Sequence, residues 1–352
     1  MIPAYRSKLA TMAGLLIFSA AADAQVQRTA EGLPDLTGTY DIRTITPLQR
    51  RQSYGDNLYL TAEQVQQMES RRATSRERGA EASDPNRGAP PEGGDGSFGP
   101  AGNVGGYNSF WIDPGDTAFK IDGKYRTSIL TQPVNGRRPV MTPAARERRS
   151  ARRSFFRPNR GDAWWLELDG PGPYDGPESR TLSDRCLLGF GSTGGPPMLP
   201  TLYNNAKRIV QTPDHVLILV EMIHDARIIR LNSKHAPASV KRWLGDSIGW
   251  WEGDTLVVET TNFKSRTTAG GDTEGLKVVE RFTRVDENTL NYAFTVEQPQ
   301  TWSEPWGGEY PWPQSDTRVY EYACHEANYA MEGILKGARI LEADALAEAG
   351  GN

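Results

Sequence analysis

The sequence contains few of the residues on which metal and thiol chemistry depend. Among its 352 residues, two are cysteine and four are histidine. The histidines are His215, His224, His235 and His325. None of them belongs to a His-x-His, HExxH or Cys–His arrangement with the spacing of a zinc site. We therefore expect no metal site and no cofactor.

A large excess of charge of one sign is also lacking. Lys and Arg number 40 against 44 Asp and Glu, which gives a formal net charge of −4. Nucleic-acid binding needs a contiguous basic face that neutralises phosphates, so we expect no nucleic-acid partner. The exception is a run of arginines from Arg146 to Arg153, which follows the helix-starting pair Thr142-Pro143. The run is typical of the solvated face of a short helix, with a polyanion or membrane-surface site as the alternative.

Long hydrophobic runs are missing as well. The longest, Leu9–Ala22, is too short to span a bilayer. It follows Arg6 and Lys8 and precedes Ala22-Asp23-Ala24, a small-x-small cleavage site. This order predicts a secretory signal peptide over residues 1–24, and the alternative is a frayed apolar end. We therefore expect a periplasmic or secreted protein with no membrane span.

The expected export of the protein determines the redox state that we expect for its two cysteines, Cys186 and Cys324. In an oxidising compartment an even pair predicts a disulfide, which here would close a very long loop. Such a bond contributes roughly 4–5 kcal/mol in the chain-entropy model. The alternative is a reactive thiol at Cys324, beside His325 and Glu326.

Short β-strands separated by turns are abundant. Gly249–Thr261 predicts a hairpin, with an aromatic strand, an acidic turn at Glu252-Gly253-Asp254 and an alternating β-branched strand. A similar turn recurs at Asp286–Leu290 and, more loosely, at Pro213–Leu217. A second hairpin is expected over Phe119–Ile129, with Asp122-Gly123 at its tip. Other strands are expected around residues 38–42, 208–212, 216–222, 227–231, 278–284, 290–297 and 318–324. Helices are expected over 60–78, after 142–143 and over 327–349, and a flexible loop over 79–106.

Turn signals throughout, without regular alternation of strands and helices, indicate a mainly β fold, either a sandwich or a closed barrel. The length suits one large domain or two small ones, and we expect a single domain over residues 25–352. Gly38-Thr39-Tyr40 resembles the Gly-x-aromatic opening of lipocalin-like barrels. We therefore expect an antiparallel up-and-down barrel with peripheral helices and long loops.

Two longer strings are distinctive: Trp251–Thr260 (WEGDTLVVET) and Tyr320–Glu326 (YEYACHE). Together with shorter strings between Cys186 and Arg339, they resemble a group of secreted proteins of acidobacteria and sphingomonads. The resemblance implies export and a bacterial periplasmic setting. It implies no role for any individual residue.

Two His–carboxylate pairs are candidates for acid–base catalysis. His224 and Asp225 lie at the break between two expected strands, where Arg227 could stabilise a developing oxyanion. His325 and Glu326 lie at the start of the last expected helix. The alternative interpretations are a polar hairpin tip for the first pair and a charged helix start for the second.

The candidate ligand-binding residues are Trp302, Trp306, Tyr310, Trp312, Arg230 and Glu259. The four aromatic residues lie in a Pro-rich segment, which predicts a rigid loop whose rings either stack on a planar ligand or cover the end of the core. Arg230 lies close to the His224 pair, and Glu259, like Glu280, would anchor a ligand if it faced the barrel interior.

These observations lead us to expect an exported β-barrel protein that binds a small, partly apolar or aromatic molecule at the barrel mouth. The alternative is a cofactor-independent lyase, isomerase or hydrolase that uses the His–carboxylate pairs. A third hypothesis is a structural or envelope-interaction protein whose aromatic loop contacts a partner.

Overall fold

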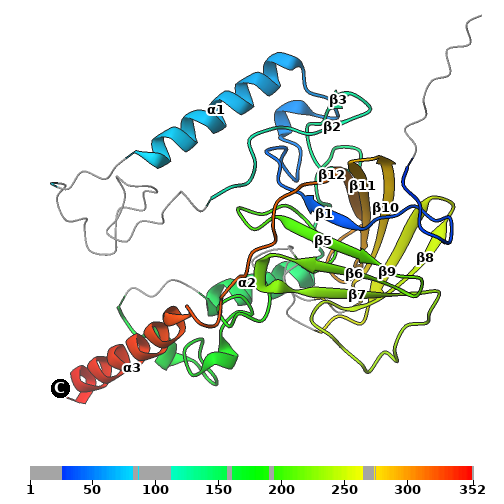
Figure 1. Ribbon diagram of the computed structural model, residues 1–352. Coiled ribbons are helices and arrows are strands. Elements are labelled where there is room, and N and C mark those ends of the chain that lie inside the picture. Colours follow the sequence, from blue (N-terminus) through cyan, green and yellow to red (C-terminus); the bar gives the residue numbers. More distant parts are fainter. Residues whose placement is uncertain are drawn as a thin grey trace, which may run out of the picture.

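The computed structural model describes residues 26–81, 86, 112–156, 161–189, 194–264, 273 and 275–350 (Figure 1). The signal peptide expected over residues 1–24 lies outside the described residues, as does most of the loop expected over 79–106. None of the described helices combines the length and apolar character of a membrane-crossing segment.

One ten-stranded sheet forms the body of the molecule. Its strands, in spatial order, are β1 (Gly38–Asp41), β5 (Ala206–Gln211), β6 (His215–Val220), β7 (Ala226–Leu231), β8 (Asp246–Glu252), β9 (Thr255–Thr261), β10 (Lys277–Asp286), β11 (Thr289–Glu297), β12 (Trp306–Pro313) and β4 (Leu130–Gln132). A separate hairpin consists of β2 (Lys120–Ile121) and β3 (Lys124–Tyr125). The predicted hairpin at Gly249–Thr261 is confirmed as β8–β9.

The pairing is antiparallel throughout the large sheet, except between β7 and β8. These two strands run parallel, with Ile229 opposite Ser247 and Leu231 opposite Gly249. Parallel neighbours need a crossover connection, and residues 232–245 provide it. A simple up-and-down order of strands is therefore broken at this point.

The sheet curls strongly but does not close (Figure 1). The edge strand β1 touches the chain just after β12 at one isolated bridge between Tyr40 and Gln314, where the N–H of Ser315 also donates to the Thr39 carbonyl (2.8 Å). Because β1 has four residues and β4 three, neither edge is long enough to continue the ladder. The expected mainly β fold is confirmed, whereas the expected closed barrel is wrong: the sheet is a half-barrel.

The curled sheet encloses the main hydrophobic core. Alternate side chains of the long strands β10 and β11 are buried, as the period-two pattern predicts. Phe282, Tyr292 and Trp312 form the centre of an aromatic cluster, with 4.8 Å between the ring centroids of Tyr292 and Trp312. This core contains the rings that the sequence suggested for a surface loop.

The prediction of a loop over residues 302–313 is wrong, because Trp306–Pro313 form strand β12. Two glycines allow the close approach: a Cβ would lie 2.3 Å from the Phe294 carbonyl oxygen at Gly307, and 2.2 Å from the Ile129 carbonyl oxygen at Gly308. Since β4 pairs only with these two glycines, the rest of β12 is an edge, where proline is tolerated.

The described residues also form three α-helices and four short 3-10 helices outside the sheet. They are α1 (Ala62–Ala80), α2 (Pro143–Phe155), α3 (Tyr329–Gly350), η1 (Gln52–Tyr54), η3 (Trp164–Glu167), η4 (Pro177–Ser179) and η5 (Met222–His224). Thr61 and Thr142 cap α1 and α2 through their side chains, so both predicted helix starts are confirmed. The strand predicted over 318–324 is wrong, because this segment pairs with no strand of the sheet and is held by the disulfide instead.

Candidate functional site

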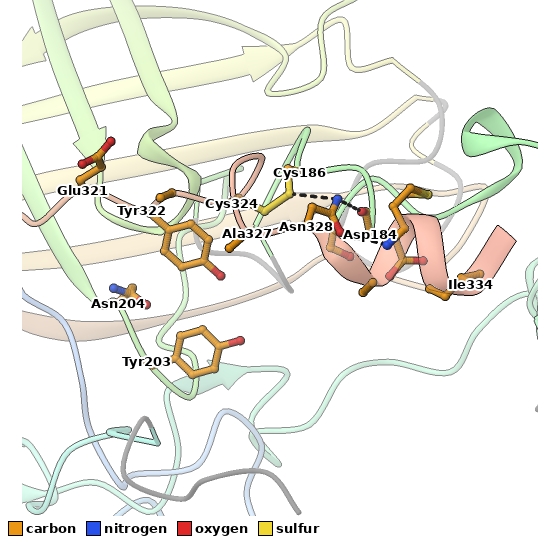
Figure 2. A pocket seen from close by; sticks show the side chains of 14 residues that line it. Asp184, Cys186, Tyr203, Asn204, Glu321, Tyr322, Cys324, Ala327, Asn328 and Ile334 are labelled. Carbon is orange, nitrogen blue, oxygen red and sulfur yellow. Dashed lines mark hydrogen bonds between the residues drawn. A yellow bond between two sulfur atoms is a disulfide. The ribbon is translucent and has the colours of Figure 1, made fainter. Parts of the chain in front are cut away.

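A pocket of about 640 Å³ lies between the C-terminal segment and the residues just before β5 (Figure 2). Tyr203 and Tyr322 lie at one end of this pocket, and Asn328, at the start of α3, lies at the other. The Cys186–Cys324 disulfide forms the wall between these two ends. The pocket therefore depends on segments that are far apart in the sequence.

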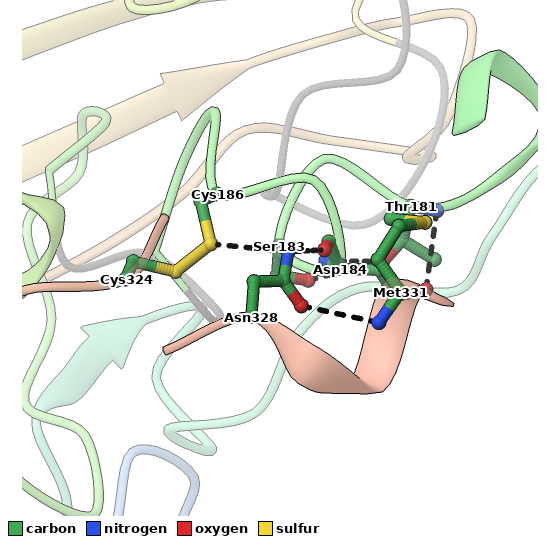
Figure 3. Close-up of a disulfide and its surroundings, with 7 residues drawn as sticks. All are labelled: Thr181, Ser183, Asp184, Cys186, Cys324, Asn328 and Met331. Atoms are coloured by element: carbon green, nitrogen blue, oxygen red, sulfur yellow. Dashed lines mark hydrogen bonds between the residues drawn. A yellow bond between two sulfur atoms is a disulfide. The ribbon is translucent and has the colours of Figure 1, made fainter. Parts of the chain in front are cut away.

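The predicted disulfide between Cys186 and Cys324 is confirmed, with 5.7 Å between the Cα atoms (Figure 3). Both cysteines of the chain are used in it, so the alternative of a reactive thiol at Cys324 is wrong. The Asn328 amide donates to the Asp184 carbonyl (2.8 Å) and lies 3.5 Å from the Cys186 sulfur. The disulfide thereby joins the 181–189 loop to the start of α3.

The pocket rests on an apolar cluster at the end of β6. Val220, Met222 and Ile223 are buried there and pack against Tyr203 and Tyr322. The chain then turns sharply, since Ile223 and the following histidine both have positive φ, 62° and 46°. A β-branched residue rarely adopts this conformation, and consecutive residues of this kind store strain.

Two ionisable groups, Lys207 and Asp225, lie close to this strained turn. Their opposite charges attract each other. Lys207 is completely buried, and its Nζ has no hydrogen-bond partner among the described residues. Burial lowers the pKa of Lys207 to about 7, although Glu221, Asp41 and Asp225 oppose this shift. Burial also raises the pKa of Asp225 to about 6, against the effect of the Gly189 backbone N–H.

The sequence reasoning did not select Lys207 as a functional residue. The available signal was its position two residues before Ile209 in an alternating strand, which places both side chains on the buried face. Asp225 was selected, and one of its carboxylate oxygens, Oδ2, has no hydrogen-bond partner within the described parts of the chain. His224, selected with it, is exposed to solvent.

Arg227 does not lie with His224 and Asp225 at a barrel mouth, because it faces the interior of the sheet. Its guanidinium forms two hydrogen bonds to Glu280, of 3.0 and 2.6 Å, and both side chains are almost fully buried. Tyr292 donates to the same carboxylate (2.8 Å) and accepts from the backbone N–H of Met198 (2.8 Å). The Met198 backbone thus contacts the tyrosine that holds Glu280, and Arg227 and Glu280 form an ion pair inside the core.

Arg230 and Glu259 belong to a different network on the outer face of the sheet. Arg230 forms hydrogen bonds to both oxygens of Asp246 (3.0 and 2.9 Å), and His235 bridges Asp246 (2.9 Å) and Glu259 (3.2 Å). Burial works to raise the pKa of Asp246, but the backbone N–H of Ala236 and the His235 and Arg230 side chains bring it below its usual value. His235, which the sequence did not single out, is the centre of this network.

The remaining selected residues do not converge on the pocket. His325 and Glu326 are exposed in the turn before α3, next to the pocket but not in its lining. Trp306, Tyr310 and Trp312 are at most 2% exposed, so their rings offer no face to a ligand from solvent. The half-buried Trp302 packs against Trp306, with 6.1 Å between the ring centroids.

No protein-family model matches this chain, and no curated protein matches it. Within the described ranges, no group of three or more His, Cys, Asp or Glu side chains could hold a metal ion. The pocket and the buried groups beside it are therefore the features from which a function can be inferred.

Proposed function

We propose that the protein binds a small, partly apolar or aromatic molecule in the pocket beside the Cys186–Cys324 disulfide. The observation that carries this proposal is the pocket itself, whose volume of about 640 Å³ falls in the usual range for small-molecule sites. Tyr203 and Tyr322 supply aromatic surface at low entropic cost, and the apolar cluster beneath keeps them in place. This location replaces the barrel mouth, since the half-barrel interior is filled by side chains.

The charges around the pocket favour a neutral or cationic molecule over an anion. Among the described residues of its lining, two are carboxylates, Asp184 and Glu321, and none is Lys or Arg. Asp184 is paired with Arg180 (3.1 Å), whereas Glu321 is exposed at the tyrosine end. A ligand with a hydrogen-bond donor near an aromatic ring fits this arrangement.

A second candidate function is a cofactor-independent lyase, isomerase or hydrolase. It is favoured by the carboxyl group of Asp225, whose pKa of about 6 suits proton transfer near neutral pH. Its neighbour His224 is exposed, so the two groups of this pair differ in their access to solvent. For either function we infer a periplasmic or secreted setting, in which a disulfide persists.

The test is a screen of neutral and cationic aromatic compounds by melting temperature and mass spectrometry, which detects both retained and altered compounds. A bound compound should raise the melting temperature, by an amount that corresponds to about 2.7 kcal/mol at 100 times its Kd. Replacing Tyr322 with alanine should weaken binding roughly tenfold to a hundredfold, because a buried ring contributes about 1.5–3 kcal/mol.

Tyr329→Ala is the matched control, since this tyrosine is 79% exposed on α3. Circular dichroism should show that both variants fold. Equal weakening by the two substitutions, or compounds that bind only to the unfolded chain, would contradict the proposed site. Conversion of a retained compound into a product would favour the enzymatic candidate.

A further inference from the structure

We propose that Lys207 captures carbonyl compounds: its amine forms an imine with an aldehyde or ketone group of a molecule that enters through the pocket beside the disulfide. This inference rests on the proposed small-molecule function and names the substrate class for it. It assigns a covalent role to a residue that lies behind the pocket.

The position of Lys207 connects it to the pocket. It lies in β5, three residues after Asn204 of the pocket lining, and its register partner in β6 is Val220. Val220 in turn belongs to the apolar cluster that packs against Tyr203 and Tyr322. Val220 therefore lies beside Lys207 in the sheet and also belongs to the cluster that supports the tyrosine end of the pocket.

The bonding state of Lys207 differs from that of the other buried cations. Arg227 is paired with Glu280, and Arg284 donates to the Tyr40 hydroxyl (3.1 Å). In contrast, the Nζ of Lys207 is buried without a hydrogen-bond partner among the residues described. An unpartnered buried amine destabilises a fold, and desolvation is what makes a lysine a nucleophile towards carbonyl carbon.

Asp225 supplies the proton transfers that imine formation needs. The neutral amine of Lys207 attacks the carbonyl carbon, and one of the two protons on its nitrogen moves to the carbonyl oxygen to give a carbinolamine. The Asp225 carboxyl group then donates a proton to the departing hydroxyl, so that one water leaves as the C=N bond forms. Loss of the nitrogen proton to the Asp225 carboxylate restores the acid.

The strained turn at Ile223 and His224 adjoins both parts of this site, because Ile223 belongs to the apolar cluster at the pocket and Asp225 follows His224 directly. Non-glycine residues in this conformation are strained. A rearrangement that relaxes the turn recovers part of this strain energy, so the turn is suited to open when a ligand binds. The ligand would then reach Lys207.

The test uses benzaldehyde with sodium cyanoborohydride at pH 7, followed by intact-mass measurement and peptide mapping. A reduced adduct should form at Lys207 at least tenfold faster than at exposed lysines such as Lys336, because exposed lysines are protonated almost completely at this pH. Asp225→Asn should slow the adduct about tenfold or more, and it should alter the pH profile of labelling. In Lys207→Arg the enriched adduct should be absent, whereas Lys336→Arg should retain it.

The outcomes separate this inference from the proposed function. Benzaldehyde that raises the melting temperature of wild type and Lys207→Arg equally, without an enriched adduct, overturns imine formation and leaves the pocket as a binding site. Enriched labelling of Lys207 that survives Tyr322→Ala overturns entry through the pocket. Labelling spread over surface lysines, with no shift in melting temperature, overturns both proposals. Peptide mapping of wild type is decisive even if Lys207→Arg does not fold.

Discussion

Replacing Lys207 with methionine is expected to flatten the dependence of stability on pH between pH 7 and pH 9. Burial lowers the pKa of Lys207 from 10.5 to about 7, so over this range the unfolded chain binds a proton that the folded chain has released. The free energy of unfolding must then rise with pH, and this contribution is lost as the pH falls through about 7. Since one pKa unit corresponds to about 1.4 kcal/mol, Lys207 should add about 2 kcal/mol of stability from pH 7 to pH 9.

Asp225 does not obscure this effect. Burial raises its pKa from 3.8 to about 6, so its contribution to stability is present below pH 3.8 and is lost as the pH rises through about 6. The loss is therefore nearly complete before the range in which Lys207 acts. Together the two groups should give a minimum in their combined contribution between about pH 6 and pH 7.

The assay is urea unfolding at pH 7, 8 and 9 of wild type, Lys207→Met and the exposed control Lys336→Met. Wild type and Lys336→Met should gain about 2 kcal/mol more than Lys207→Met between the two ends of the range. Parallel lines for wild type and Lys207→Met would refute the reasoning, because they would mean that the Lys207 amine keeps its proton in the folded protein.

Three further perturbations test other parts of the structure. Replacing Cys324 with serine opens a loop of 138 residues and should lower the free energy of unfolding in urea by about 4–5 kcal/mol. The same substitution should abolish the ligand-dependent rise in melting temperature. Arg227→Met should lower the free energy of unfolding by about 3–5 kcal/mol, because it leaves Glu280 buried without its cation. Adding Glu280→Leu should recover most of this loss. A double variant as unstable as the single one would contradict the prediction. Gly308→Ala brings a Cβ within 2.2 Å of a backbone carbonyl and should expose the β4 amides to hydrogen exchange, whereas Gly333→Ala, which meets nothing within 4 Å, should not.

Local sequence patterns predicted the hairpins and helix starts, whose hydrogen bonds join residues that are close together in the sequence. The hairpins β8–β9 and β10–β11 follow from alternating side chains around acidic turns, and both helix caps follow from a threonine before the first turn. The pairing of β4 with β12 and the parallel pairing of β7 with β8 left no such signal. They depend on glycine contacts and on a crossover that only the assembled sheet reveals.

The sequence predicted one long-range contact of the candidate site, the disulfide between Cys186 and Cys324. Pairing the two cysteines places Tyr322, two residues before Cys324, next to the 181–189 loop. Nothing local indicated that Tyr203 would join them. Lys207 was missed because a lysine in a strand is most often solvated, whereas this one lies between Tyr40 of β1 and Val220 of β6 on the buried face of the sheet.

The disulfide also determines how the protein carries mechanical load. Cys186 precedes β5 and Cys324 follows β12, so the covalent bridge encloses every strand from β5 to β12. A pulling force applied to the two ends of the chain passes through the bridge and bypasses the enclosed strands. Under such tension β1 and β4, which precede Cys186, can peel from the sheet, while the enclosed strands stay folded until the sulfur–sulfur bond is reduced.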